Sequence, residues 1–196
     1  MATYLTGIVN ETDLVFTGGF PGPLRNVLGI QSEEIDYIYE DERNALSICS
    51  ANSPSGLEGT FELANVCDVV RAETAEVIGV YERDFYAGSP ALTRNKFGAG
   101  EAWYVAAAPA DGALLDSLYG AIVAESGLRR ALPDCQLPEG VTAQIRCNGE
   151  SEYIFLMNFN NQEVELELST PRVELLTGRK IEGSFRLPAY GALVLQ

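Results

Sequence analysis

The chain has 196 residues, enough for one large domain or for an ordinary domain followed by a small one. Its composition, 46% hydrophobic and 21% charged, is typical of a folded globular protein rather than a disordered one. The net charge of −15 argues against a nucleic-acid partner, because phosphate recognition draws on clustered Lys and Arg. No apolar run approaches the ~20 residues that a membrane helix needs, so no membrane partner is expected either.

Four cysteines and no histidine narrow the possible chemistry. Ser-His-Asp and Cys-His nucleophile arrangements are excluded, as are metals held by histidine. A zinc site would need all four thiolates, and no CxxC pair is present, so no metal and no cofactor are predicted. Free, largely buried thiols indicate a reducing compartment, and the N-terminus lacks the basic and apolar regions of a signal peptide. We therefore expect a cytoplasmic protein.

Short strands and turns are expected to alternate through the first half of the chain. In chain order, the sequence predicts a strand over 3–9, a Gly/Pro loop over 17–23, one or two helical turns over 24–30 ended by Gly29, strands over 35–40, 45–51 and 59–66, a short apolar segment over 67–72 and a strand over 75–81. Residues 91–97 and 101–107 are expected to pair as a hairpin, because a glycine-containing turn joins them.

The clearest helix of the sequence is predicted over 111–127. Its apolar side chains recur at the 3.6-residue period, Asp111 is the expected N-cap, and Gly127 is expected to end the helix. The members of this apolar stripe are Leu114, Leu115, Leu118, Tyr119, Ile122 and Val123. Two prolines and no periodicity follow, which indicates an interdomain linker.

From Val141 onward the pattern changes to six short strands separated by turn signals. No helix is predicted there, so a small antiparallel sandwich or open barrel is expected. The predicted domains are therefore residues 1–130, a linker at 131–138, and a small β-domain at 139–196.

The stretch from Tyr81 to Val105 resembles an active site in composition, because it holds acids, bases and aromatics together. Glu82 and Asp84 would share a face if the strand continued through them, and a retaining glycosidase needs carboxyl groups ~5–5.5 Å apart. A polar turn at a strand end explains the same residues and is the favoured interpretation. The glycines at 98–100 do not form a phosphate cradle, because a strand rather than a helix follows them. No catalytic residue is predicted.

Two long motifs carry a family resemblance. "GIVNETDLVFTGGFPGPLRNVLGI" (7–30) and "YERDFYAGSPALTRNKFGAGEAWYV" (81–105) closely resemble the region after the catalytic barrel in bacterial β-galactosidases of glycoside hydrolase family 42. The later "PEGV", "LLTG" and "LPAYGALVL" resemble the C-terminal β-domain of the same family. In that family a TIM barrel carries both catalytic glutamates, an α/β domain resembling class I glutamine amidotransferases mediates trimerisation, and a small β-domain follows.

The resemblance implies a division of labour between this chain and a catalytic barrel. The expected fold is an α/β, amidotransferase-like domain truncated at its N-terminus, followed by a small all-β antiparallel sandwich. No residue matches the acid/base or nucleophile motifs of the barrel, so the chain is expected to be inactive alone. Amidotransferase chemistry is not expected, because neither Cys49 nor Cys67 lies in a nucleophile elbow. The implied partners are two further copies, forming a homotrimer, and the catalytic TIM-barrel domain of the parent enzyme.

The residues expected at the subunit interface are aromatic, proline and arginine residues of the two motifs. They are Phe20, Pro21, Arg25, Arg83, Phe85, Tyr86 and Arg94. Two alternatives stay open at this point. One is an independent glycosidase that uses an acid pair such as Glu82 and Asp84. The other is a carbohydrate-binding module acting through Tyr153, Phe155 or Tyr190, although the alternation around Phe155 predicts that this side chain faces the core.

Overall fold

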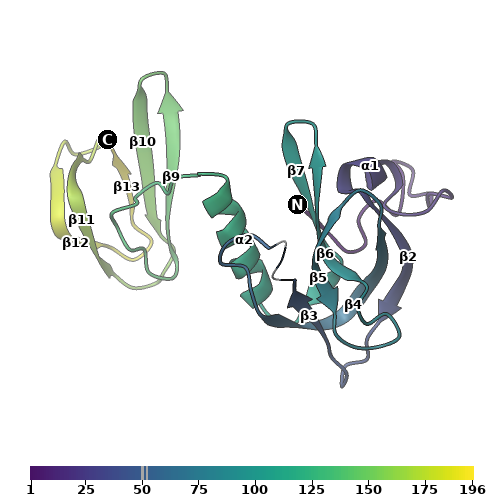
Figure 1. The fold of residues 1–196 in the computed structure, drawn as a ribbon. Helices are drawn as coiled ribbons and strands as arrows, with labels where there is room; N and C mark the ends of the chain where they lie inside the picture. Colours follow the sequence, from purple (N-terminus) through teal and green to yellow (C-terminus); the bar gives the residue numbers. More distant parts are fainter. Residues whose placement is uncertain (50, 52) are drawn as a thin grey trace. The chain divides into compact units, whose positions relative to one another are not determined.

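Strands make up most of the regular structure of the chain (Figure 1). The computed structural model describes residues 1–49, 51 and 53–196, and these divide into two units, Met1–Gly127 (unit 1) and Leu128–Gln196 (unit 2). Both units are built on sheets, as expected, but unit 1 holds more strand and less helix than the predicted α/β domain. Its likeness to glutamine amidotransferases stays a prediction.

Unit 1 contains one sheet. Its elements are β1 (Ala2–Thr3), a 3-10 turn (Gly22–Leu24), α1 (Arg25–Leu28), β2 (Ile30–Tyr37), β3 (Asn44–Ile48), β4 (Thr60–Ala72), β5 (Glu76–Tyr81), β6 (Pro90–Phe97), β7 (Gly100–Val105), β8 (Ala107–Pro109) and α2 (Ala113–Glu125). The strand order is β1-β7-β6-β5-β3-β4-β2, with β8 paired to β4. Among the described strands of this sheet, β1 and β7 pair in parallel and the other pairs are antiparallel.

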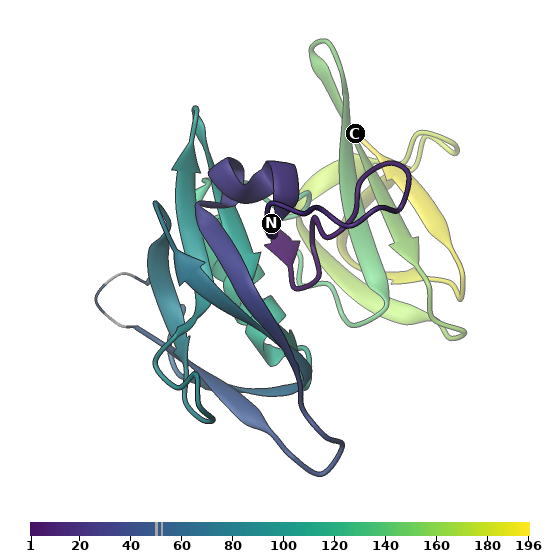
Figure 2. The same cartoon turned by 90° about the vertical axis from the view of Figure 1, so that its right-hand side faces the viewer.

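Five of these pairings close a ring of strands. β7 runs on through Ala106 into β8, and β8 pairs with β4, which already pairs with β3. Because β3 pairs with β5, β5 with β6 and β6 with β7, the ring returns to its start. Figure 2 shows the strands of unit 1 curving around one another rather than lying flat. The interior is filled by Leu46, Leu63, Ile78, Leu92, Val105 and their buried neighbours.

Several local predictions are confirmed. α1 ends at Gly29, which has a φ of 66° and supplies the left-handed conformation that commonly stops a helix. β5 matches the predicted strand over 75–81, and β6 and β7 form the predicted hairpin, with Phe97 opposite Gly100. The predicted strand over 45–51 is β3, although Ser50 lies outside the described residues.

The predicted strand over 3–9 is wrong. β1 covers Ala2 and Thr3, and the chain then turns at Leu5 and Gly7, which have φ values of 61° and 68°. An ideal Cβ at Gly7 would lie 2.3 Å from the carbonyl oxygen of Pro21, so a side chain here would collide with the Gly/Pro loop. The apparent alternation of apolar residues therefore comes from a folded-back turn, which periodicity alone does not distinguish from a strand.

A single 13-residue strand, β4, replaces the predicted strand over 59–66 and the separate segment after it. Asn65 interrupts the regular backbone with a φ of 65°, and the pairing partners change around it. Residues before Asn65 pair with β3, whereas Val66 to Ala72 pair with β2. β4 therefore stays one strand, because its first half pairs with β3 and its second half pairs with β2.

The predicted helix is confirmed as α2, with a narrower buried face than expected. Gly127 has a φ of 61°, as expected after a helix end. The N-cap is Gly112 rather than the predicted Asp111, whose carboxylate oxygen accepts the backbone N–H of Ala113 at 2.9 Å. Leu114, Leu118 and Ala121 are the buried residues of this helix. Tyr119 and Val123, which belong to the predicted stripe, are 49% and 40% exposed.

Unit 2 is antiparallel, with five strands rather than the six predicted. They are β9 (Val141–Asn148), β10 (Ser151–Asn158), β11 (Val164–Val173), β12 (Lys180–Leu187) and β13 (Ala192–Leu195). β13, β10 and β9 form one sheet, and β11 and β12 form the other. Leu132 and Cys135, from the predicted linker, are buried in the core of this unit. The prediction that Phe155 faces the core is wrong: Ile154 and Leu156 are buried, and Phe155 points outward from β10.

A polar cluster lies inside unit 1 around Asp68, which is 2% exposed. One carboxylate oxygen accepts the Tyr104 hydroxyl and the backbone N–H of Leu5, at 3.3 Å from the latter. Among the described residues no donor lies within hydrogen-bonding distance of the other oxygen. Burial raises the pKa of Asp68, and it also raises the pKa of the adjacent Cys67 thiol to about 11, so that thiol is protonated and unreactive at neutral pH.

Candidate assembly surface

The seven residues predicted at a subunit interface lie in three regions of unit 1. We name these the Arg83 patch (Arg43, Arg83, Asp84 and Phe85, over buried Tyr86), the Arg25 patch (Phe20, Pro21 and Arg25, with Glu73 and Arg71), and the Arg94 cleft. Each is built by a different set of strands and is described in turn.

Buried hydrogen bonds hold the backbone of the Arg83 patch in place. Asn44, at the start of β3, is 2% exposed. Its side-chain N–H donates to the carbonyl of Arg83 at 3.0 Å, and its side-chain oxygen accepts the N–H of Arg83 at 3.1 Å. The same oxygen accepts the N–H of Ala45 at 2.7 Å. One buried amide therefore fixes the loop after β5 against the start of β3.

Phe85 and Tyr86 take different roles in this patch. Tyr86 is 3% exposed, donates its hydroxyl to Asp36 at 2.8 Å, and packs edge-on against Tyr81 with ring centroids 4.9 Å apart. Phe85 packs edge-on against Tyr86 at the same centroid distance and is 70% exposed. Tyr86 thus supports the patch from inside, and Phe85 presents the ring that a partner would contact.

A hollow of about 260 Å³ lies beside Arg83. It is lined by Ile38, Glu42, Arg43, Asn44, Arg83 and Asp84. Arg83 donates to the carbonyl of Arg43 at 3.1 Å, which joins the two walls of the hollow. Sequence reasoning missed Arg43 and Asn44. The signal in the sequence was the pair of tyrosines just before them, Tyr37 and Tyr39, since tyrosine and arginine are enriched at interface hot spots, and both rings prove to be more than 60% exposed.

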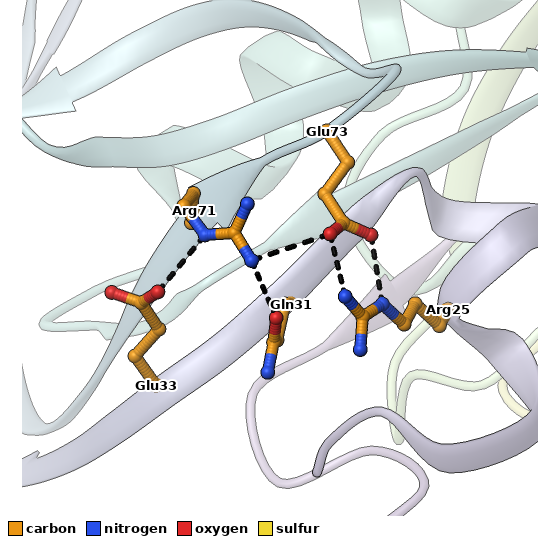
Figure 3. Close-up of polar contacts among 5 residues, drawn as sticks. All are labelled: Arg25, Gln31, Glu33, Arg71 and Glu73. Atoms are coloured by element: carbon orange, nitrogen blue, oxygen red, sulfur yellow. Dashed lines mark hydrogen bonds and ion pairs between the residues drawn. The ribbon is translucent and has the colours of Figure 1, made fainter. Parts of the chain in front are cut away.

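Exposed ion pairs, by contrast, organise the Arg25 patch (Figure 3). The Arg25 guanidinium makes two contacts with the carboxylate of Glu73, at 2.8 and 2.6 Å. Arg71 reaches the same carboxylate at 3.3 Å and also contacts Glu33 at 2.9 Å and Gln31 at 2.6 Å. The hydrogen bond from Arg25 lowers the pKa of Glu73. The network ties the start of α1 to the end of β4.

The aromatic and proline residues of the Arg25 patch lie close to the same strands. The carbonyl of Phe20 accepts the N–H of Ser32 at 3.0 Å, which attaches the Gly/Pro loop to β2. Pro21 is buried against Gly7, so it shapes the loop and offers little area to a partner. Phe20 and Arg25 are half-buried.

Arg94 lies at a cleft of about 740 Å³ between β7 and α2. Its guanidinium pairs with Glu76 at 2.9 Å and with Glu125 at 3.4 Å, and lies 5.4 Å from the ring centroid of Trp103. Arg94 lies on β6, and these three partners come from three other elements, β5, α2 and β7. The side chain is 17% exposed, so its part in unit 1 is to join strands to helix.

The acid pair is not arranged as a glycosidase pair. β5 ends at Tyr81, so Glu82 and Asp84 do not continue a strand and do not share a strand face. Glu82 binds the Ser47 hydroxyl, whereas Asp84 has a φ of 71° and accepts the N–H of Phe85 at 2.6 Å. Each carboxylate is used by its own local structure, as the polar-turn interpretation predicted.

Comparison with known protein families shows which family the chain belongs to. A family profile described as the β-galactosidase trimerisation domain matches residues 1–129, and one described as the β-galactosidase C-terminal domain matches residues 140–196. The chain belongs to glycoside hydrolase family 42. Within that family it corresponds to the non-catalytic trimerisation and C-terminal regions, in agreement with the sequence resemblance.

Relatives and solved structures agree with this placement. The β-galactosidase BglY of Alicyclobacillus acidocaldarius is 44% identical over 195 residues, covering 99% of this chain and 28% of that protein. The β-galactosidase Pbg of Clostridium perfringens is 39% identical over 197 residues, covering 100% of this chain and 28% of that protein. The crystal structure of β-galactosidase from Bacillus circulans sp. alkalophilus superposes with a TM-score of 0.83, at 41% identity over 98% of this chain and 28% of that one. The chain thus spans about 28% of the length of the curated relatives that it matches.

The described part of the family 42 chain contains no helix that is both long enough and apolar enough to cross a membrane. Its cysteines form no disulfide in that part: Cys67 and Cys135 are buried, Cys49 is half-buried and Cys147 is exposed.

Proposed function

We propose that this chain is the assembly and C-terminal part of a β-galactosidase, and that it forms a homotrimer. The parent enzyme would hydrolyse terminal β-D-galactosides with two glutamates of a catalytic TIM-barrel domain, which is the second partner of this chain. The observation that carries the proposal is the match of residues 1–129 to a β-galactosidase trimerisation domain.

A cyclic trimer requires two different patches on each subunit, because each subunit contacts one neighbour with one face and the other neighbour with another. The Arg83 and Arg25 patches are our candidates for these two faces. The Arg83 patch has the composition of an interface hot spot, with an exposed aromatic ring and arginines around a hollow. Its backbone is fixed before any partner arrives, which lowers the entropic cost of association.

The finer structural expectations belong to the same proposal. We propose residues 1–130 and 139–196 as the two domains and 131–138 as the segment between them, which is supported by the two matched ranges and the gap between them. Leu132 and Cys135 of this segment pack into the core of unit 2, so the segment would stay attached to the second domain. The amidotransferase-like relationship of the first domain belongs to the same proposal, and the β1–β7 pairing is the one parallel pairing among the described strands of its sheet. A cytoplasmic location is supported by the two buried thiols and by the unpaired state of the described cysteines.

Light scattering over a dilution series tests the assembly proposal directly. A mass of three chains that persists on dilution would show that these residues suffice for a trimer. A mass of one chain at every concentration would overturn it.

An independent glycosidase remains the rival activity, and it has a separate test. We expect no turnover of an aryl β-galactoside by the purified chain, because Glu82 and Asp84 are engaged in different local contacts. Turnover that disappears in Glu82→Gln would establish the rival instead.

A further inference from the structure

A rigid corner of unit 2 carries two exposed aromatic rings that are not part of the proposed assembly surface. It is formed by three segments, 138–141, 158–162 and 188–191, which we call the aromatic corner. Phe159 is 63% exposed and Tyr190 is 72% exposed. Tyr190 has a φ of 54°, in the left-handed region that a bulky residue seldom adopts.

Buried hydrogen bonds fix the three segments to one another. The Asn158 side chain is 2% exposed and donates to the carbonyls of Gln162 at 2.9 Å and Pro188 at 2.9 Å. Its oxygen accepts the N–H of Asn160 at 2.9 Å. The N–H of Tyr190 then donates to the carbonyl of Asn160 at 3.1 Å, so the two aromatic-bearing loops are joined directly.

The third segment is fixed in the same way. The N–H of Phe159 donates to the carbonyl of Gly140 at 2.8 Å, and the Asn160 side chain donates to the carbonyl of Glu139 at 2.9 Å. An ideal Cβ at Gly140 would lie 2.4 Å from the Asn160 amide oxygen, so the approach of these two segments requires glycine. The framework is therefore ordered before any ligand binds.

The chemistry of the aromatic corner selects the kind of ligand. Of the 13 residues in its three segments one, Glu139, is charged, in a chain with a net charge of −15. Asn161 and Gln162, in the same segment as Phe159, are exposed and carry neutral amides, which can both donate and accept hydrogen bonds. Flat rings beside neutral amides suit a ligand with an apolar C–H face and a rim of hydroxyls, which describes a pyranose sugar.

We propose that the aromatic corner is a surface binding site for a neutral carbohydrate chain containing β-linked galactopyranose. The axial 4-hydroxyl of galactose leaves the C–H bonds at C3, C4 and C5 together on the opposite face, and this face can stack on an aromatic ring. The choice of galactose rests on the proposed β-galactosidase function; the choice of a neutral carbohydrate rests on the corner itself. The site would hold polymeric substrate near the enzyme and would take no part in bond cleavage.

Native affinity electrophoresis of the full chain, in gels with and without soluble β-1,4-galactan, tests the site. We expect galactan to retard the wild-type chain. Tyr190→Asn removes the ring while asparagine tolerates the left-handed backbone, and Phe159→Ala removes the second ring. Each substitution should raise the dissociation constant for galactan, obtained from the retardation, by about tenfold, the effect of losing one aromatic anchor. Phe155→Ala, an exposed aromatic on β10, is the matched control and should migrate as the wild type.

Four results would overturn the proposal or part of it. No retardation, or equal retardation of wild type and both variants, would reject the site. Equal retardation by a mixed-linkage β-glucan would reject galactose as the preferred sugar. A lower oligomeric mass of Tyr190→Asn in light scattering, without galactan binding by the wild type, would assign the corner to a protein interface. Because mass and retardation are measured separately, failure of this site is distinct from failure of the assembly proposal.

Discussion

The Arg83 and Arg25 patches offer arginines to the surface in opposite ways. In the Arg83 patch a buried amide, Asn44, holds the loop, and the guanidinium of Arg83 contacts a backbone carbonyl. In the Arg25 patch, partly exposed ion pairs tie the start of α1 to the end of β4. Buried hydrogen bonds are costly to leave unmade, whereas exposed ion pairs are weak and screened by salt. Two surfaces predicted for one role should therefore differ in stability and in response to salt and pH.

The largest effect is expected from Asn44→Ala. The substitution leaves the N–H and the carbonyl of Arg83 without their buried partner, which should lower the free energy of unfolding by about 2–3 kcal/mol. Urea unfolding monitored by circular dichroism measures the change. Asn26→Ala, at an exposed asparagine of α1, is the control and should change the stability little. A loss no greater than that of the control would mean that the Arg83 patch is not held from inside.

Phe85→Ala should act on assembly rather than on folding. The ring is 70% exposed within one chain, so its loss costs the monomer little, but an interface anchor contributes about 1–2 kcal/mol. We expect the trimer to dissociate at roughly five to thirty times higher concentration in sedimentation equilibrium. Phe97→Ala, at a ring that is 52% exposed on the β6–β7 hairpin, is the matched control. If the two variants dissociated at the same concentration, Phe85 would not be part of the interface.

Asp68→Asn should stabilise the chain at neutral pH, by about 1 kcal/mol. Burial raises the pKa of Asp68 in the folded state, so its charged form is disfavoured there. The stability that depends on Asp68 is thus fully present below its ordinary pKa of 3.8 and is lost as pH rises through the higher native value. Urea unfolding of both proteins from pH 4 to pH 7 should show a smaller decline for the variant. Lower stability of the variant at pH 7 would show that the carboxylate is preferred.

The smallest effect is expected from Arg25→Ala, and it should depend on solvent conditions. Glu73 has a lowered pKa because of Arg25, so the pair contributes stability above the ordinary carboxyl pKa of 4.5 and loses it as pH falls through the native value. The difference between variant and wild type should shrink at acid pH and in 1 M NaCl, where the screening length is about 3 Å. A difference that salt leaves unchanged would mean that packing of the Arg25 stem, rather than charge, is responsible.

Regular elements with their own local signals were predictable from the sequence. Gly29 and Gly127 mark helix ends through their left-handed backbone, and the β6–β7 hairpin follows from its glycine turn. The family was also identified from its motifs. In each case a few consecutive residues carry the information.

Features set by distant partners were not predictable in the same way. The backbone at Leu5 turns because the Gly/Pro loop and Asp68 lie against it, and β4 continues past Asn65 because a second partner strand is available. Asn44 anchors a loop that is 39 positions away along the chain, and no pattern around it marks that role. Phe155 was misplaced because two apolar residues flank it, and only the pairing of β10 decides which set faces inward.

The ring of strands in unit 1 has a consequence for behaviour at high concentration. Closure leaves β2 at the edge of the sheet, with one side bonded to β4 and the other paired with the Gly/Pro loop only at the Phe20–Ser32 bridge among the described residues, and an unpaired strand edge invites aggregation with other chains. β2 bears Glu33, Glu34 and Asp36, and its register with β4 shifts between Ser32 and Glu34. Acidic side chains and an irregular register both discourage edge-to-edge pairing. The acidic side chains of β2 therefore disfavour open-ended pairing between copies of this chain at this edge of the sheet.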